Sequence, residues 1–108
     1  MNAWVWLGDI VYTEGEKMDD LALKYSIQKS LPAYRKLSSK TNIFGVWDDH
    51  DFGPNDADRN WIHGDWARES FKAFWANPSY GAPAGADNLG TAFRYCDVEF
   101  FMFCLLYT

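Results

Sequence analysis

The stretch "NIFGVWDDHDFGPND", residues 42–56, passes from an apolar run directly into a group of charged side chains. Its first six residues, up to Trp47, have the composition of a buried strand. Three carboxylates and one of the two histidines follow at once: Asp48, Asp49, His50 and Asp51. At about 7 Å and an effective dielectric near 20, each like-charged pair costs roughly 2 kcal/mol. The loop therefore needs a bound cation, raised carboxylate pKa values or exposure to solvent.

A second apolar run lies near the start of the chain. Ala3 to Leu7 is apolar on both faces, which is typical of a strand inside a parallel sheet, and Gly8 ends it. The two runs are far enough apart for a helical crossover, so we predict an α/β fold in which they pair in parallel. Ligand sites of open α/β sheets lie beyond the carboxyl ends of the strands. We therefore expect Asp9 and Asp49 to face each other across a cleft.

The segment between these two strands reads as two helices. Residues 17–30 form the first, with Asp19 as a plausible N-cap. Pro32 suits the start of a short second helix. Three apolar side chains of the first helix are expected on one side: Leu21, Tyr25 and Ile27.

The second half of the chain continues with a helix, a connector and a hairpin. We predict a helix over residues 64–76, whose heavy buried face is aromatic: Trp66, Phe71, Phe74 and Trp75. The connector over residues 77–91 is rich in Gly and Pro and predicts a solvated surface. A hairpin should turn near Cys96 and Asp97, and its apolar second arm suits an interior strand of a larger sheet. Cys96 and Cys104 could face each other or not.

Composition narrows the classes of partner. A chain of 108 residues can bury one modest core, and its 19% of aromatic residues marks a folding sequence. The net charge of −5 argues against a nucleic-acid or anionic-membrane partner. No apolar stretch reaches the length of a membrane span, and no signal peptide is visible. A phosphate-bearing substrate would need a local positive centre, which a metal would have to supply.

Ordinary structural roles compete with a metal site at both acidic turns. Asp9 follows Gly8, so it could serve a turn through an Asx-type hydrogen bond, with Tyr12 half-buried nearby. The run from Asp48 to Asp51 could be a solvated loop that caps a following helix. A calcium loop counted from Asp49 fails, because Pro54 takes the place of the required Gly.

Zinc and hydrolytic metal sites differ in the ligands that they need. A structural zinc site needs four Cys or His ligands, and His50 with His63 does not make one. Carboxylates suit a hard cation, and a histidine held by an acid can ligate a metal or donate a proton. A two-metal centre would suit phosphoryl transfer. His63 is otherwise a surface or half-buried residue, Arg59 could hold a substrate oxygen or form a salt bridge, and Trp47 and Trp61 could wall the cleft.

Three motifs together resemble a known family. "WLGDIVY", "WDDHDFGPND" and "FWANPSYG", with "DVEFFM" near the end, closely resemble the alkaline-phosphatase-D-like (PhoD-like) branch of the metallophosphoesterases. The resemblance runs from about Ala3 to Phe103. It implies an αββα sandwich, and it implies metal-dependent hydrolysis of phosphate monoesters or diesters at a dinuclear centre. The metals would be drawn from iron, calcium, zinc or manganese, and the substrate would be a small phosphate ester.

The resemblance also assigns roles to individual residues. It points to Asp9 as the bridge between two metal ions, to Tyr12 as a ligand of one metal and to Asp49 as a ligand of the other. It places His50 near the leaving group, as proton donor or transition-state stabiliser. Asp51 resembles the acid that orients this histidine.

The family pattern extends beyond the segments found in this sequence. An upstream strand with an early Cys or Asp ligand is missing, as are the later loops that carry histidines. Residues 1–108 are therefore expected to be part of a PhoD-like domain. A second hypothesis is a catalytically inactive remnant whose aromatic surface serves binding or association. Calcium binding without chemistry is a third.

Overall fold

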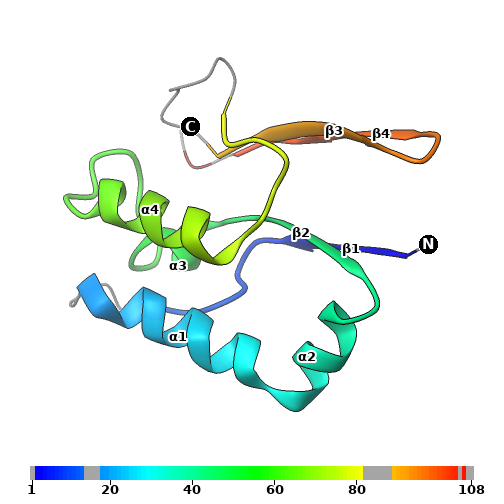
Figure 1. Cartoon of the computed structure of the whole chain (residues 1–108). Coiled ribbons are helices and arrows are strands. Elements are labelled where there is room, and N and C mark those ends of the chain that lie inside the picture. Colours follow the sequence, from blue (N-terminus) through cyan, green and yellow to red (C-terminus); the bar gives the residue numbers. More distant parts are fainter. Residues whose placement is uncertain (1, 14–17, 82–88, 105, 107–108) are drawn as a thin grey trace.

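The fold is a mixture of helices and small sheets. The computed structural model describes residues 2–13, 18–81, 89–104 and 106, without the side chains of Met18 and Asp19. The elements follow in the order β1 (Ala3–Leu7), α1 (Met18–Ser30), α2 (Pro32–Ser38), β2 (Asn42–Val46), α3 (Asp49–Phe52), α4 (Gly64–Phe74), β3 (Thr91–Tyr95) and β4 (Val98–Met102). The expected α/β class is thereby confirmed. Figure 1 shows the β3–β4 hairpin over one side of the β1–β2 sheet and helices α1 and α2 on the other.

The parallel crossover predicted from the two apolar runs is present. β1 and β2 pair in parallel, in a register that runs from Ala3 opposite Asn42 to Leu7 opposite Val46. This pairing brings both carboxyl ends to one edge of the sheet. The strand was predicted to include Trp47, but β2 ends one residue earlier at Val46.

Helix α1 differs from the prediction at two positions. The helix begins at Met18, so Asp19 lies in its first turn and is not the N-cap. Leu21 and Tyr25 are buried as expected, but Ile27 is 57% exposed. Two helical positions separate Ile27 from Tyr25, which is about 200° around the helix axis, so the two side chains point in opposite directions. Pro32 opens α2 as predicted.

An aromatic core joins helix α4 to the β1–β2 sheet. The helix ends at Phe74, two residues before the predicted end, and Trp75 leaves it in an extended conformation. The Trp75 ring stacks on Phe71 at a centroid distance of 5.6 Å, and Phe71 also contacts Trp47. Phe71 and Trp75 are buried as predicted, whereas Trp66 and Phe74 are half-buried at the margin of the core. Trp75 also covers Gly45, where an added Cβ would come within 2.8 Å of its ring.

The connector after α4 is anchored in the core at Asn77 and Leu89, which the prediction of a solvated surface missed, whereas Pro78 and Ser79 are exposed as predicted. The Asn77 side chain accepts a hydrogen bond from the Gly45 N–H at 3.1 Å and donates one to the Gly45 carbonyl at 2.6 Å. Leu89, at the other end of the connector, is 1% exposed. Asn77 is held in the core because it hydrogen-bonds the backbone of Gly45 in β2, and Leu89 is buried because it is apolar. Residues 82–88 lie outside the described part of the chain.

The hairpin turns at Cys96 and Asp97, as predicted. β3 and β4 pair antiparallel, and the hairpin contacts β2 through Phe44 and Phe93, whose ring centroids lie 4.3 Å apart. Both cysteines are free thiols. Within the described residues β4 pairs with β3 alone, so the prediction of an interior strand is wrong for this chain.

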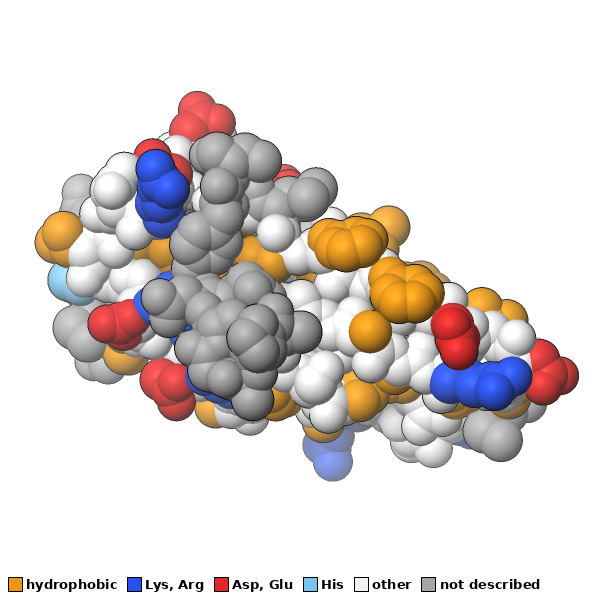
Figure 2. All heavy atoms as spheres, turned by 90° about the horizontal axis from the view of Figure 1, so that it is seen from above, with side chains coloured by type: hydrophobic (Ala, Val, Ile, Leu, Met, Phe, Trp, Pro, Cys, Tyr) orange, Lys and Arg blue, Asp and Glu red, His pale blue; other side chains and the backbone are white. Residues whose placement is uncertain are grey.

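The outer face of the hairpin is apolar toward the end of β4 and carries the exposed charged side chains Arg94 and Glu99 nearer the turn. Figure 2 shows hydrophobic side chains gathered over it, and Phe101 and Phe103 are 65% and 72% exposed. An apolar arm stays on the surface here because no described element lies against its outer side. Every helix within the described part of the chain is too short or too polar to cross a lipid bilayer.

Candidate metal centre

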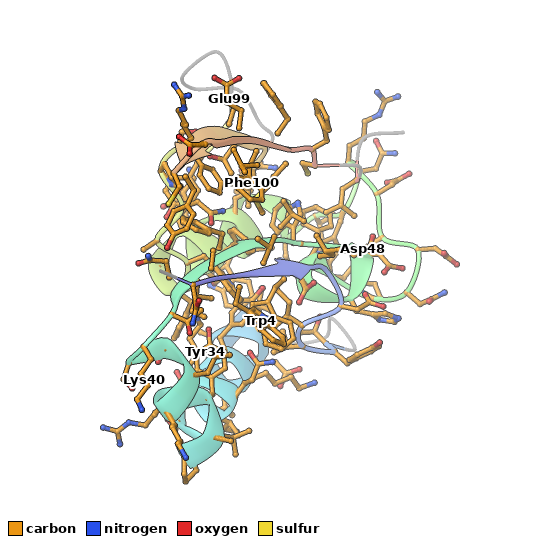
Figure 3. All side chains as sticks on the ribbon, turned by 90° about the vertical axis from the view of Figure 1, so that its right-hand side faces the viewer. Trp4, Tyr34, Lys40, Asp48, Glu99 and Phe100 are labelled. Atoms are coloured by element: carbon orange, nitrogen blue, oxygen red, sulfur yellow. The ribbon has the colours of Figure 1, made fainter. Side chains whose placement is uncertain are left out.

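Three side chains that could hold a metal converge at the carboxyl ends of β1 and β2. One potential ligand atom each from Asp9, Asp49 and His50 lies within 4.8 Å of the other two. The expected meeting of Asp9 and Asp49 is therefore observed, although about forty residues separate them in sequence. Figure 3 shows the neighbouring Asp48 beyond the end of the β1–β2 sheet, away from Trp4 and Tyr34. We call Asp9, Asp49 and His50 the candidate metal centre.

The turn after β1 brings Asp9 to this position. Gly8 has φ +104°, and an added Cβ would lie 2.7 Å from the Cβ of Asp48. Only glycine allows the two strand ends to approach so closely at this backbone conformation. Asp9 itself has φ 50°, in the left-handed region that Asp tolerates better than most residues. The turn expected from the "GD" sequence exists, and it leaves the Asp9 carboxylate exposed at the centre.

Tyr12 contacts both Asp9 and His50. Its hydroxyl donates to Asp9 Oδ2 at 3.1 Å, and its ring lies 4.4 Å from the His50 ring between centroids. The hydrogen bond to Asp9, followed by the charge of that carboxylate, raises the pKa of Tyr12. Tyr12 is 58% exposed, more than the half-burial expected of it. The phenol is placed to orient the Asp9 carboxylate.

The acidic residues after β2 form the short helix α3 and its cap. Asp48 is the N-cap, and its Oδ1 accepts from the Asp49 N–H at 2.9 Å. Asp48 is exposed, so the alternative of a solvated capping residue applies to this position. The Asp49 carboxylate accepts from its neighbour His50 N–H at 2.9 Å and from Asp56 N–H at 2.6 Å. These two backbone donors hold Asp49 in place and leave lone pairs on both oxygens for a cation.

Asp51 has a different set of partners from the one expected. It is fully buried, and its Oδ1 accepts from the N–H groups of Ile10 and Val11 at 2.9 Å each. Its Oδ2 accepts from Asp48 N–H at 3.1 Å. No hydrogen bond between Asp51 and His50 occurs among the contacts described for these loops. Asp51 instead connects the loop after β1 to the loop after β2.

Burial dominates the electrostatics of Asp51. Loss of solvent, with a smaller contribution from the nearby Asp9 charge, raises the pKa of Asp51 to about 6. The hydrogen bonds from Val11, Asp48 and Ile10 oppose that shift because they stabilise the ionised form. Of the three possibilities raised for the acidic loop, a raised carboxylate pKa thus applies to Asp51 and solvent exposure applies to Asp48.

Thr13 and Gln28 support the centre and were not singled out by the sequence. The Thr13 hydroxyl lies 3.1 Å from the carbonyl oxygens of both His50 and Gly53, either of which can accept its proton. Gln28 Nε2 donates to the Ile10 carbonyl at 2.8 Å. Both side chains fasten the loop after β1 to neighbouring elements. No local pattern predicts these contacts, because each joins residues at least 18 positions apart.

The other candidates lie outside the centre. His63 immediately precedes α4, with its ring 5.3 Å from that of Trp61, and Arg59 is exposed. Trp61 is half-buried against Gly53, while Trp47 is a core residue that is 3% exposed. These positions leave Asp9, Asp49 and His50 as the one group of metal-ligating type described for this chain.

The donor set suits a single hard or borderline cation. Two carboxylates and one imidazole match the ligand types that manganese, iron and zinc accept, whereas calcium takes six to eight oxygen ligands. Three side chains could hold one ion, and the Tyr12 hydroxyl, which the resemblance makes a further ligand, lies 3.1 Å from Asp9 Oδ2. No protein-family model, no curated protein and no solved structure matches the chain.

Proposed function

We propose that the chain contains part of a metal-dependent phosphoester hydrolase of the PhoD-like type, with Asp9 and Asp49 as metal ligands. The single observation that carries the proposal is the convergence of these carboxylates with His50 at the joint end of two parallel strands. Like charges gathered at such short distance are stabilised when a cation lies between them. The motif resemblance supports the same assignment.

The roles of the side chains follow from their positions. A bound cation would offset the negative charge of the phosphate and lower the pKa of a bound water. Because the chain has a net charge of −5, this positive charge has to come from an added ion. Asp9 and Asp49 hold the ion, and the Tyr12 hydroxyl orients Asp9. His50 would donate a proton to the departing alcohol oxygen as water adds to phosphorus and the P–O bond to that oxygen breaks. Asp51 acts on the centre indirectly, because it holds both loops through their backbone N–H groups.

Metal binding is the first test of this proposal. Calorimetric titration of the purified chain with Mn²⁺ or Zn²⁺ should give one saturable site, and Asp9→Asn should weaken it about tenfold or more. Asp97→Asn makes the same change on the exposed hairpin turn and should leave the affinity unchanged. Equal affinities of the wild type and Asp9→Asn would remove Asp9 from the site.

Turnover tests the role of His50. Hydrolysis of an aryl phosphodiester by the metal-loaded chain should fall far more in His50→Ala than metal affinity does. If affinity and turnover fall by the same factor, His50 is a metal ligand and not the proton donor. If the metal-loaded wild type hydrolyses no phosphoester, the catalytic proposal for this chain fails.

One observation favours a second function, that of an association domain. Leu7, Phe101 and Phe103 are each more than 60% exposed, and apolar surface of this kind is typical of interaction sites. Sedimentation at increasing protein concentration tests it. A dimer fraction that rises with protein concentration, in a chain that binds no metal in the titration, would favour this function over hydrolysis.

A further inference from the structure

An apolar groove lies beside the candidate metal centre. It has a volume of about 340 Å³, close to the lower end for small-molecule sites. Its walls come from the carboxyl ends of β1, β2 and β4: Leu7, Val46, Trp47, Asp48, Phe101, Met102 and Phe103. Three strand ends that come from distant parts of the sequence therefore meet at this one hollow.

The groove and the metal centre are continuous along the backbone. Leu7 lines the groove two residues before Asp9, and Asp48 lines it one residue before Asp49. Gly8 packs against Asp48 so closely that a Cβ would lie 2.7 Å from the Asp48 Cβ. The groove and the candidate metal centre are thus built on the same two turns, those that follow β1 and β2.

The lining selects an uncharged, apolar group. Asp48 is its one charged residue, and no Lys or Arg is among the residues that form its walls. A second phosphate or a carboxylate in the groove would meet the Asp48 charge without a compensating cation. The walls offer aromatic and aliphatic surface, and Phe101 and Phe103 are exposed enough to contact a ligand.

Trp47 gives the groove a rigid side. Its indole Nε1 donates to Cys104 Sγ at 2.8 Å, and its ring packs edge-on against Phe52 at 5.0 Å. A ring held on two sides keeps its orientation when a ligand enters, which lowers the entropic cost of binding.

We propose that this groove binds the aryl or alkyl part of the alcohol in a phosphate ester whose phosphate lies at the metal centre. The inference rests on the proposed function, and it deepens it by naming the substrate class as esters of uncharged apolar alcohols. Nucleotide-like or polyanionic alcohols are disfavoured by the Asp48 charge.

Binding of the alcohol alone tests the groove without metal or turnover. The metal-free chain is titrated with 4-methylphenol while the indole N–H resonance of Trp47 is followed by NMR. We expect a saturable shift, and Phe103→Ser should weaken binding about tenfold because one wall is lost. Ile62→Ser is the matched control, since Ile62 is 82% exposed and does not line the groove.

Charge provides the second arm of the test. 4-Hydroxybenzoate has the same ring with a carboxylate, and it should bind at least tenfold more weakly than 4-methylphenol. Asp48→Asn should reduce that difference. Absence of saturation, equal binding by Phe103→Ser, or equal binding of the two phenols would each overturn the inference.

The two proposals can fail separately. If metal binds at Asp9 and Asp49 while 4-methylphenol does not saturate the groove, the proposed function stands and this inference falls. If 4-methylphenol binds and no metal does, the groove is a binding site and the hydrolase proposal falls. If the Trp47 resonance broadens as protein concentration rises and does not shift with 4-methylphenol, the groove is a contact surface for a second copy of the chain. That result also overturns the inference.

Discussion

Beside the candidate metal centre a carboxylate is buried and fully paired, whereas the β3–β4 hairpin leaves apolar groups in solvent. Asp51 is fully buried and accepts three backbone hydrogen bonds, while Phe101 at the hairpin is 65% exposed. Asp51 fixes the loops after β1 and β2 relative to each other, whereas the outer side chain of Phe101 makes no comparable contact with a described element. Hydrogen bonds therefore fix the backbone conformation at the strand ends, whereas the hairpin exposes apolar surface that no described element covers.

The largest expected effect comes from removing the buried carboxylate. Asp51→Ala should lower the free energy of unfolding by about 4 kcal/mol, because the N–H groups of Ile10, Val11 and Asp48 lose their acceptor. Urea unfolding measures it, and Asp97→Ala on the exposed turn should change the same quantity by less than about 0.5 kcal/mol. A small effect of Asp51→Ala would mean that water satisfies these groups and that the contrast between the regions is weaker.

A pH series sharpens the same point. The pKa of Asp51 is raised by burial to about 6, so between pH 4 and pH 6 the folded chain binds more protons at this site than the unfolded chain. The contribution of Asp51 to stability is therefore greatest at low pH and falls as pH rises through 6, by about 3 kcal/mol in total. The difference in stability between wild type and Asp51→Asn, measured without metal, isolates this slope from the other carboxylates. A flat difference would contradict the raised pKa.

The turn at Gly8 should show an intermediate effect. Gly8→Ala places a Cβ at φ +104° and close to Asp48, so it should lower the free energy of unfolding by about 2 kcal/mol. The same change should weaken Mn²⁺ binding, because the next residue is Asp9. A stable Gly8→Ala variant with unchanged metal affinity would show that the close approach of the two strand ends is not needed.

The smallest effect is expected on the hairpin. Phe101→Ser should change the free energy of unfolding by less than about 0.5 kcal/mol, since this side chain is already largely in solvent. The variant should also be less prone to self-association, which sedimentation at several concentrations would measure. A loss of stability comparable to that of Asp51→Ala would place Phe101 in a packed core and remove the contrast.

Local patterns predicted several elements correctly. The apolar run Ala3–Leu7, the helix start at Pro32 and the turn at Cys96 and Asp97 each depend on residues adjacent in sequence. The meeting of Asp9 and Asp49 also followed from sequence, because parallel strands joined by a crossover end at the same edge of a sheet.

Other features were decided by which groups met across the fold. The acid expected to orient His50 binds the backbone of Ile10 and Val11 instead, and Asn77 binds Gly45 from 32 positions away. A hydrogen-bond donor without a partner in its own strand or helix takes the nearest acceptor in space, and sequence spacing does not encode that distance. The sequence by itself thus determined the elements and the edge where the carboxylates gather. Only the tertiary structure decided which carboxylate is buried as a connector and which ones remain free to hold a cation.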